Sequence, residues 1–207
     1  MRQVRSICVA LAFVAGCTHR VPAPPPVPSS TAARAIAVYR AIAESLYVTT
    51  TKRVVAVAAT SLDSACDGPR CGDLAARWGV ETLWWATGDS SEARSSRADL
   101  LSRATRPFDI SPVVRGRSML LEADAGDIPA ADADVNAWIR FRSTHADAAG
   151  AVRMSPVGFS ESGRTAVAFV DWRCGPTCGH TLGVALVATT DSTWSISEML
   201  LVSSRSR

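Results

Sequence analysis

Apolar and β-branched residues dominate the last third of the chain, in segments separated by short polar breaks. The segments are 152–159, 165–172, 180–189 and 192–202. The breaks are Glu161-Ser162-Gly163, a loop between two cysteines, and Thr190-Asp191-Ser192. Successive strands that are joined by short turns pair as antiparallel neighbours. The pattern therefore predicts a C-terminal antiparallel β-meander of four or more strands.

Upstream of this region, apolar residues recur at helical spacing. We expect helices over 31–47, 91–105 and 133–145. The second helix should turn Leu100 and Leu101 inward, and the third should dock Trp138 on the sheet. Four shorter elements are predicted: a strand or strand pair over 49–60, a helical turn over 73–78, an apolar element over 80–85 and an extended segment over 113–122.

The length beyond residue 30 suits one domain. About 175 residues follow that point, enough for one real core and too few for two ordinary domains. We therefore expect a single α+β domain over 31–207, with the helices packed on one face of the C-terminal sheet. A curved sheet that wraps a helix, as in cystatin-like or nuclear-transport-factor-2-like folds, fits this description.

The N-terminal residues have the composition of a secretory signal. Arg2 and Arg5 give a positive start, and 7–15 is apolar but too short to span a bilayer. The run Val14-Ala15-Gly16-Cys17 resembles the lipobox of bacterial lipoproteins, with an aliphatic residue three places before a cysteine. The resemblance implies that 1–16 is removed and that Cys17 carries more than one acyl chain. A signal cut elsewhere, or an uncleaved anchor, is the alternative.

Residues 17–30 would then link the acylated cysteine to the domain. Five of the ten residues from 21 to 30 are proline, which favours an extended polyproline II spacer. A ligand for a proline-binding partner is the alternative. The resemblance implies a protein held at a membrane of the cell envelope. In Gram-negative lipoproteins the residue after the acylated cysteine influences sorting between the two membranes. This residue is Thr18 and not an aspartate, which is compatible with the outer membrane and a domain that faces the periplasm.

Charge gives no sign of a nucleic-acid partner. Of the 22 basic residues, two lie in the first 16, so 20 remain against 19 acidic ones. The arginines are scattered singly and do not form the basic stretch that tracks phosphates. We expect no nucleic acid, and a protein or small molecule of unknown identity as the partner.

Four further cysteines form two local pairs: Cys66 with Cys71, and Cys174 with Cys178. Each pair encloses a Gly-Pro sequence that bends the chain and brings the sulfurs together. In an oxidising envelope such pairs are expected to be disulfides. A four-thiolate metal site and a redox dithiol at Cys174 and Cys178 are alternatives, and we expect neither a metal nor a cofactor.

Roughly the last seventy residues also resemble a set of uncharacterised bacterial proteins. The motifs that carry the resemblance are Trp138-Ile139-Arg140-Phe141, Met154-Ser155-Pro156-Val157-Gly158-Phe159, Ala166-Val167-Ala168-Phe169-Val170, Cys174-Gly175-Pro176-Thr177-Cys178-Gly179 and Trp194. These proteins share a Ser-x-Val-Gly-Phe strand and a turn with two Cys-Gly pairs. The resemblance implies a shared fold and brings no activity with it.

Candidate catalytic residues can be chosen, but no established motif unites them. Ser155 or Ser160 with His180 and Asp171 would make a hydrolytic set. His145 stands near Asp147 in the sequence, and both His145 and His180 are candidates for an enzymatic site. An acidic group offers oxygen ligands for calcium, although a solvated loop explains it as well: Glu122, Asp124, Asp127, Asp132 and Asp134.

The aromatic residues of the C-terminal half suggest a binding pocket between sheet and helices. They are Trp138, Phe159, Phe169, Trp172 and Trp194, which core packing explains equally well. The function expected from the sequence is a non-catalytic binding or interaction domain on a membrane-anchored envelope lipoprotein. The alternatives are an envelope hydrolase with a histidine-containing site, and a periplasmic inhibitor or immunity protein.

Overall fold

The structure of the protein is a computed structural model. It covers residues 31–48, 54–58, 90–103, 108–124, 126–129, 133–190 and 193–206. The signal segment, Cys17, the proline-rich spacer, Cys66, Cys71 and the elements expected over 73–78 and 80–85 lie outside these residues. None of the described helices combines the length and the apolarity that crossing a membrane requires.

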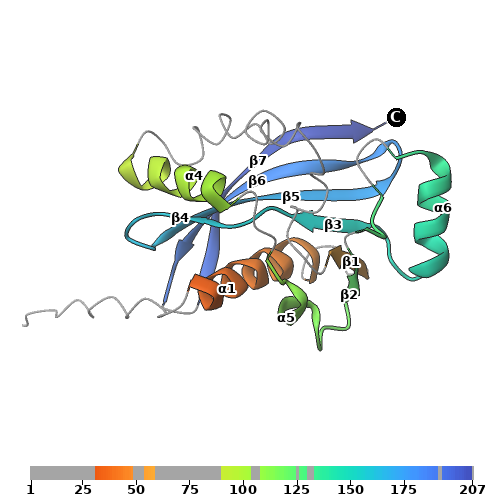
Figure 1. Cartoon of the computed structure of the whole chain (residues 1–207), viewed down its shortest axis with the longest axis horizontal. Coiled ribbons are helices and arrows are strands. Elements are labelled where there is room, and N and C mark those ends of the chain that lie inside the picture. Colours follow the sequence, from red (N-terminus) through yellow and green to blue (C-terminus); the bar gives the residue numbers. More distant parts are fainter. Residues whose placement is uncertain are drawn as a thin grey trace, which may run out of the picture.

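The described residues form helices and one mixed sheet, so the expected α+β class is confirmed (Figure 1). The helices are α1 (Thr31–Ala43), which continues as the π-helical turn η1 (Glu44–Val48), then α4 (Ser91–Arg103), α5 (Ser111–Val114) and α6 (Val135–Thr144). The strands are β1 (Val55–Ala58), β2 (Leu120–Ala123), β3 (Ala151–Met154), β4 (Gly158–Phe159), β5 (Thr165–Gly175), β6 (Cys178–Ala188) and β7 (Trp194–Ser206).

The sheet has the order β2-β1-β3-β5-β6-β7, with β4 paired to β5 beside this path. Strands β5, β6 and β7 form the predicted antiparallel meander. Strand β1 pairs in parallel with both β2 and β3, so the sheet is mixed. The single strand expected over 152–159 is split into β3 and β4. Pro156 lies between them and has no N–H for the ladder.

Helices cover both faces of the sheet, so the expectation that they share one face is wrong. Helix α1 packs on the face that carries Val57 and Val170. Helix α4 packs through Leu100 on the opposite face, near Phe169, and Figure 1 shows α1 and α4 on opposite sides of the strands. The physical reason is that the middle of β5 is buried on both faces, and each face needs its own cover.

Helix α6 covers another part of the face that α4 occupies. Its Trp138 is buried in a cluster with Ala56 and Ala151, which confirms that Trp138 docks on the sheet. Two details of the helical predictions are wrong. Leu100 is buried but Leu101 is 43% exposed, because only one of two neighbouring helix positions faces the sheet. The segment 113–122 begins in helix α5 and becomes extended only at β2.

Candidate functional site

A cleft of about 370 Å³ opens between α1, the C-terminal end of α4 and the segment that joins β3 to β4. Its described lining combines apolar and polar side chains: Ala35, Tyr39, Asp99, Ser102, Arg103, Phe108, Pro156 and Val157. Volumes of this order are typical of small-molecule sites in proteins, about 300–1,000 Å³. The cleft is the candidate binding site.

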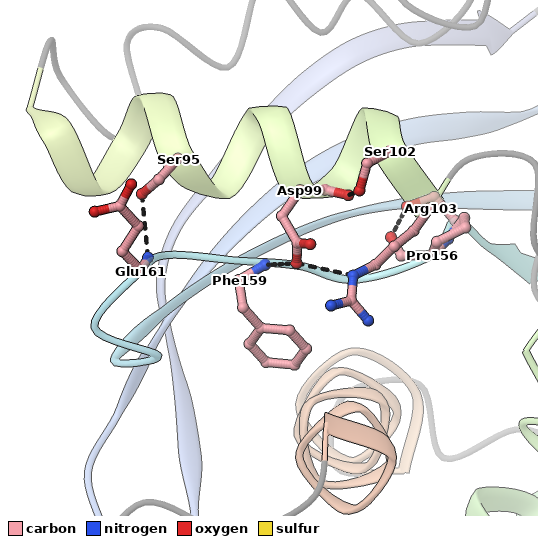
Figure 2. A network of polar contacts seen from close by, with 8 residues as sticks. Ser95, Asp99, Ser102, Arg103, Pro156, Phe159 and Glu161 are labelled. Atoms are coloured by element: carbon pink, nitrogen blue, oxygen red, sulfur yellow. Dashed lines mark hydrogen bonds and ion pairs between the residues drawn. The ribbon is translucent and has the colours of Figure 1, made fainter.

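The sequence of α4 places Asp99 and Arg103 on one side of the helix, one turn apart. Ser90 precedes the helix, and its Oγ accepts a hydrogen bond from the N–H of Ala93 at 3.2 Å, as an N-terminal cap does. Asp99 and Arg103 then form an ion pair with a distance of 2.8 Å between Oδ2 and Nε. Because Nε faces Asp99, the two terminal nitrogens of Arg103 point away from it, toward α1 (Figure 2).

Asp99 also joins α4 to the strand beside it. Its Oδ2 accepts a hydrogen bond of 2.8 Å from the backbone N–H of Phe159 in β4 (Figure 2). One turn earlier, Ser95 Oγ accepts a bond of 3.3 Å from the N–H of Glu161. Strand β4 and the turn that follows it therefore contact two successive turns of α4. These bonds fix Arg103 relative to the sheet.

Gly158 permits this close approach. A Cβ atom at this position would meet backbone and side-chain atoms of α4: the carbonyl oxygen of Ser96, the nitrogen of Leu100 at 2.5 Å and the Cβ of Leu100 at 2.6 Å. Such distances are shorter than van der Waals contact. The helix can therefore lie against β4 only because the residue there has no side chain.

Two guanidinium groups lie near the ring of Phe159. The Cζ of Arg34, in α1, is 4.8 Å from the ring centroid, and the Cζ of Arg103 is 5.8 Å from it. Both distances are in the range of a cation–π interaction. Trp194 packs on the same ring, with centroids 5.7 Å apart. Phe159 thus brings one cation from α1 and one from α4 into the same neighbourhood.

Tyr39 forms a buried polar contact in the cleft wall. It is fully buried, and its hydroxyl donates a hydrogen bond of 2.8 Å to the carbonyl oxygen of Ser155. Its ring lies 5.8 Å from that of Phe108, measured between centroids. This bond holds α1 against the segment that leads from β3 into β4, so the wall is built from three separate parts of the sequence.

The network on α4 extends to the turn between β4 and β5. Ser162 Oγ donates to Glu92 Oε2 at 2.7 Å. Hydrogen bonds from Ser160 first, and then from Ser162, lower the pKa of the Glu92 carboxyl below its ordinary value. Glu92 therefore favours its charged form in the folded protein. The contact lies at the other end of α4 from the cleft and anchors the helix there.

The structure does not gather the five candidate aromatic residues in one cavity. Phe159, Trp172 and Trp194 belong to the cluster on the α1 face, and Phe169 packs with Leu100 on the opposite face. Trp138 and Phe141 both belong to α6 and pack between this helix and the sheet. Of these five, only Phe159 adjoins the cleft, through its contact with Arg103. The others serve as core.

The candidate hydrolytic residues are also kept apart. His180 lies opposite Trp172 in the β5–β6 ladder, and Asp171 lies opposite Thr181, so their side chains leave opposite faces. Asp171 pairs with Arg173 at 2.7 Å. Ser155 Oγ accepts a hydrogen bond from the N–H of Phe169, and Ser160 Oγ accepts one from the N–H of Thr165. Neither serine is bonded to a histidine within the described residues.

The two histidines differ in their surroundings. His180 stacks on Trp172 with ring centroids 5.2 Å apart, and burial, opposed by the charge of Asp171, lowers its pKa. His145 ends α6 and stacks on Phe141 at 5.0 Å. Each imidazole packs on an aromatic ring, and neither lies in the cleft lining.

The acidic residues that the sequence suggested as calcium ligands make separate structural contacts and do not form one site in the described part of the chain. Asp134 caps α6 by accepting from the N–H of Ala137, and Glu122 accepts from Ser111. Asp124 closes a turn with Asp127 through their backbone atoms, while Asp132 lies outside the described residues. Within the described part of the chain, no three His, Cys, Asp or Glu side chains converge as a metal site would require.

Cys174 and Cys178 lie within disulfide-bonding distance at the tip of the β5–β6 hairpin, with Cα atoms 5.1 Å apart. The Nη2 atom of Arg142 donates to the carbonyl oxygen of Cys174 at 2.8 Å, so α6 holds this tip. The pair is remote from Phe159 along the strands. It is a structural contact of the sheet and not part of the cleft.

The residues that line the cleft could hardly be predicted from the sequence. Asp99 and Arg103 are spaced four apart, which by itself indicates an ordinary helix ion pair. In the sequence, Tyr39 and Arg34 are typical residues of an amphipathic helix. They belong to a site because residues 155–159 pack against them in the fold. This contact is distant in the sequence, so no local sequence pattern predicts it.

Comparison with known proteins identifies no relative. No family model matches the chain, and no curated protein or solved structure is similar enough to count as a match. The site must therefore be interpreted from its own geometry. That geometry offers two cations, an aromatic and apolar wall and a carboxylate that is already paired, which suits binding.

Proposed function

We propose that this protein is a lipid-anchored lipoprotein of the cell envelope whose domain over 31–207 is a non-catalytic binding module. The run Val14-Ala15-Gly16-Cys17 carries the proposal, because small residues directly before a cysteine at the end of an apolar segment are typical of lipid attachment. In a Gram-negative cell the protein would be held at the outer membrane and would face the periplasm.

The domain offers two observations that support this role. The proximity of Cys174 and Cys178 suits a disulfide, the state that an oxidising compartment favours. The cleft between α1 and α4 offers a preformed volume lined by both apolar and polar side chains. A binding module displayed on a spacer makes use of both. The partner is a small molecule or a protein that meets the domain at the membrane surface.

The anchor is tested by replacing Cys17 with serine in the full chain. Lipid attachment needs the thiol, so Cys17→Ser should move the protein from the membrane fraction to the soluble fraction and remove labelling by a palmitate analogue. Cys8→Ser is the matched control, since Cys8 would leave with the signal segment. Membrane retention of the Cys17→Ser protein, with unchanged labelling, would contradict the proposal.

A further inference from the structure

We propose that the cleft between α1 and α4 binds a small organic anion, a carboxylate or phosphate joined to a compact apolar or aromatic group. This inference rests on the binding role proposed above and names the class of ligand. Three observations support it: the positive charges beside the cleft, one buried N–H of Arg34 that has no partner among the described residues, and the apolar part of the cleft wall.

Among the described residues, the contacts near Phe159 bring together two cations and one carboxylate. Arg34 and Arg103 both lie over or beside its ring, and Asp99 is the carboxylate that pairs with one of them. Two cations held near one ring repel each other, and one carboxylate neutralises only half of their charge. An anion placed between them would relieve this repulsion. Guanidinium groups favour carboxylate and phosphate because their parallel N–H groups match two oxygens.

Of the two arginines, Arg34 gives the stronger indication of a bound anion. Its Nε is buried and has no hydrogen-bond partner among the described residues. A buried N–H of a charged group that lacks an acceptor costs free energy, because it has lost its hydrogen bonds to water. The Phe159 ring is the contact that the structure gives to its charge. An oxyanion that reaches this guanidinium would supply an acceptor that the described residues do not provide.

Arg103 is held ready for a ligand. Asp99 accepts from its Nε, and Asp99 is in turn fixed by the N–H of Phe159. The terminal nitrogens therefore keep their direction toward α1 without a ligand (Figure 2). Such preorganisation lowers the entropy that binding would otherwise cost. Asp99 acts here as a positioning residue and not as a ligand contact.

The rest of the lining indicates that the ligand is more than a bare ion. Ala35, Phe108, Pro156 and Val157 provide an apolar and aromatic wall, and Tyr39 also lines the cleft. Inorganic phosphate would leave most of the 370 Å³ to water. A phenyl or short alkyl group attached to the anion would bury this surface, which stabilises the complex in proportion to area.

The test uses the full chain, purified in detergent at constant ionic strength, and measures its melting temperature against ligand concentration. The probes are phenyl phosphate and benzoate, with benzyl alcohol as the neutral analogue and inorganic phosphate as the bare ion. Phenyl phosphate or benzoate should raise the melting temperature saturably. Their apparent dissociation constants should increase at least tenfold in Arg34→Gln and in Arg103→Gln.

The matched control is Arg140→Gln, an exposed arginine on α6 far from the cleft, which should bind like the unaltered chain. Arg34→Lys and Arg103→Lys keep the charge and should bind better than the glutamine variants, so a folding defect is distinguished from lost recognition. Equal shifts in all variants, equal effects of benzyl alcohol, or equal affinity for inorganic phosphate would each overturn the inference.

Failure of this inference is separate from failure of the anchor. If the protein fractionates with the membrane through Cys17 but binds neither organic anion, the proposed ligand class is wrong and the proposed lipid anchor still holds. If the protein binds phenyl phosphate but stays in the soluble fraction, the proposed anchor is wrong and the proposed binding site in the cleft still holds. Carboxylate and phosphate sources are distinguished by which of the two probes binds more tightly.

Discussion

The carboxylate of Asp99 accepts a hydrogen bond from the backbone N–H of Phe159, 60 residues away in the sequence and 2.8 Å away in space. This bond ties helix α4 to strand β4 and fixes the orientation of Arg103. It is a charge-assisted bond to a partly buried N–H, a class that contributes more than neutral hydrogen bonds do. The integrity of the cleft depends on it.

Asp99→Ala should therefore destabilise the protein by about 2 kcal/mol, because the N–H of Phe159 loses its acceptor. Asp99→Asn is the informative comparison. It keeps an oxygen that accepts from this N–H and loses mainly the ion pair with Arg103, which contributes roughly 0.5 kcal/mol at a partly exposed helix site. Urea unfolding of both variants measures the difference. Equal losses for alanine and asparagine would show that the bond to Phe159 is unimportant.

Gly158 predicts a second, steric effect. Gly158→Ala places a Cβ within 2.6 Å of atoms of Leu100, so α4 must move off the strand. We expect a loss of about 1–3 kcal/mol, the range for overpacking in a filled core. Gly126→Ala is the matched control, since nothing lies within 4 Å of its Cβ position. Thermal unfolding should separate the two variants, and a near-neutral Gly158→Ala would contradict the close packing described here.

The C-terminal half of the fold could be predicted from the sequence because its contacts are local. Strands β5, β6 and β7 follow one another through short turns, and the pleat sets which residues face inward. The parallel pairs could not be predicted. Val55 pairs with Leu120, and Ala56 with Ala151, and nothing in the neighbourhood of either segment specifies a partner so distant. Such contacts are set by the packing of the whole domain.

The cleft was hidden for the same reason. The aromatic character of Phe159 pointed to a possible wall, but its neighbours Arg34 and Arg103 lie far before it in the chain. Conversely, Trp138 and Phe169 have the composition of a pocket and are core, because both faces of the sheet are covered by helices. Residue type alone does not distinguish an aromatic side chain that lines a cleft from one in the core. The arrangement of helices and sheet in layers does.

Glu92 gives a pH dependence with a defined sign. Hydrogen bonds from Ser160 and Ser162 lower its pKa in the folded protein below the ordinary value of 4.5. The stabilisation is therefore complete above this value and is lost as the pH falls through the folded pKa. Glu92→Gln should flatten the acid side of the stability profile. The change is small, because solvent screens this partly exposed group.

Urea midpoints between pH 6 and pH 3, about three units across the carboxyl range, would measure this effect. Glu198→Gln, at an exposed glutamate on β7, serves as the control and should leave the profile unchanged. A profile of Glu92→Gln that parallels the unaltered chain at every pH would remove the proposed role of the serine contacts.

Cys174 and Cys178 lead to the last prediction, which also bears on the compartment. They are four residues apart at the tip of the β5–β6 hairpin, so a disulfide there closes a very short loop. The chain-entropy relation gives about 2 kcal/mol for a loop of this size. Cys174→Ser, Cys178→Ser and the double variant should therefore lose the same amount, because either single change already opens the loop. Thiol titration of the unreduced protein, combined with urea unfolding with and without reductant, measures both the bond and its effect. If reductant left the midpoint of the unaltered chain unchanged, or if both thiols titrated freely in protein taken from the envelope, the disulfide and the support it gives to an oxidising location would be lost together.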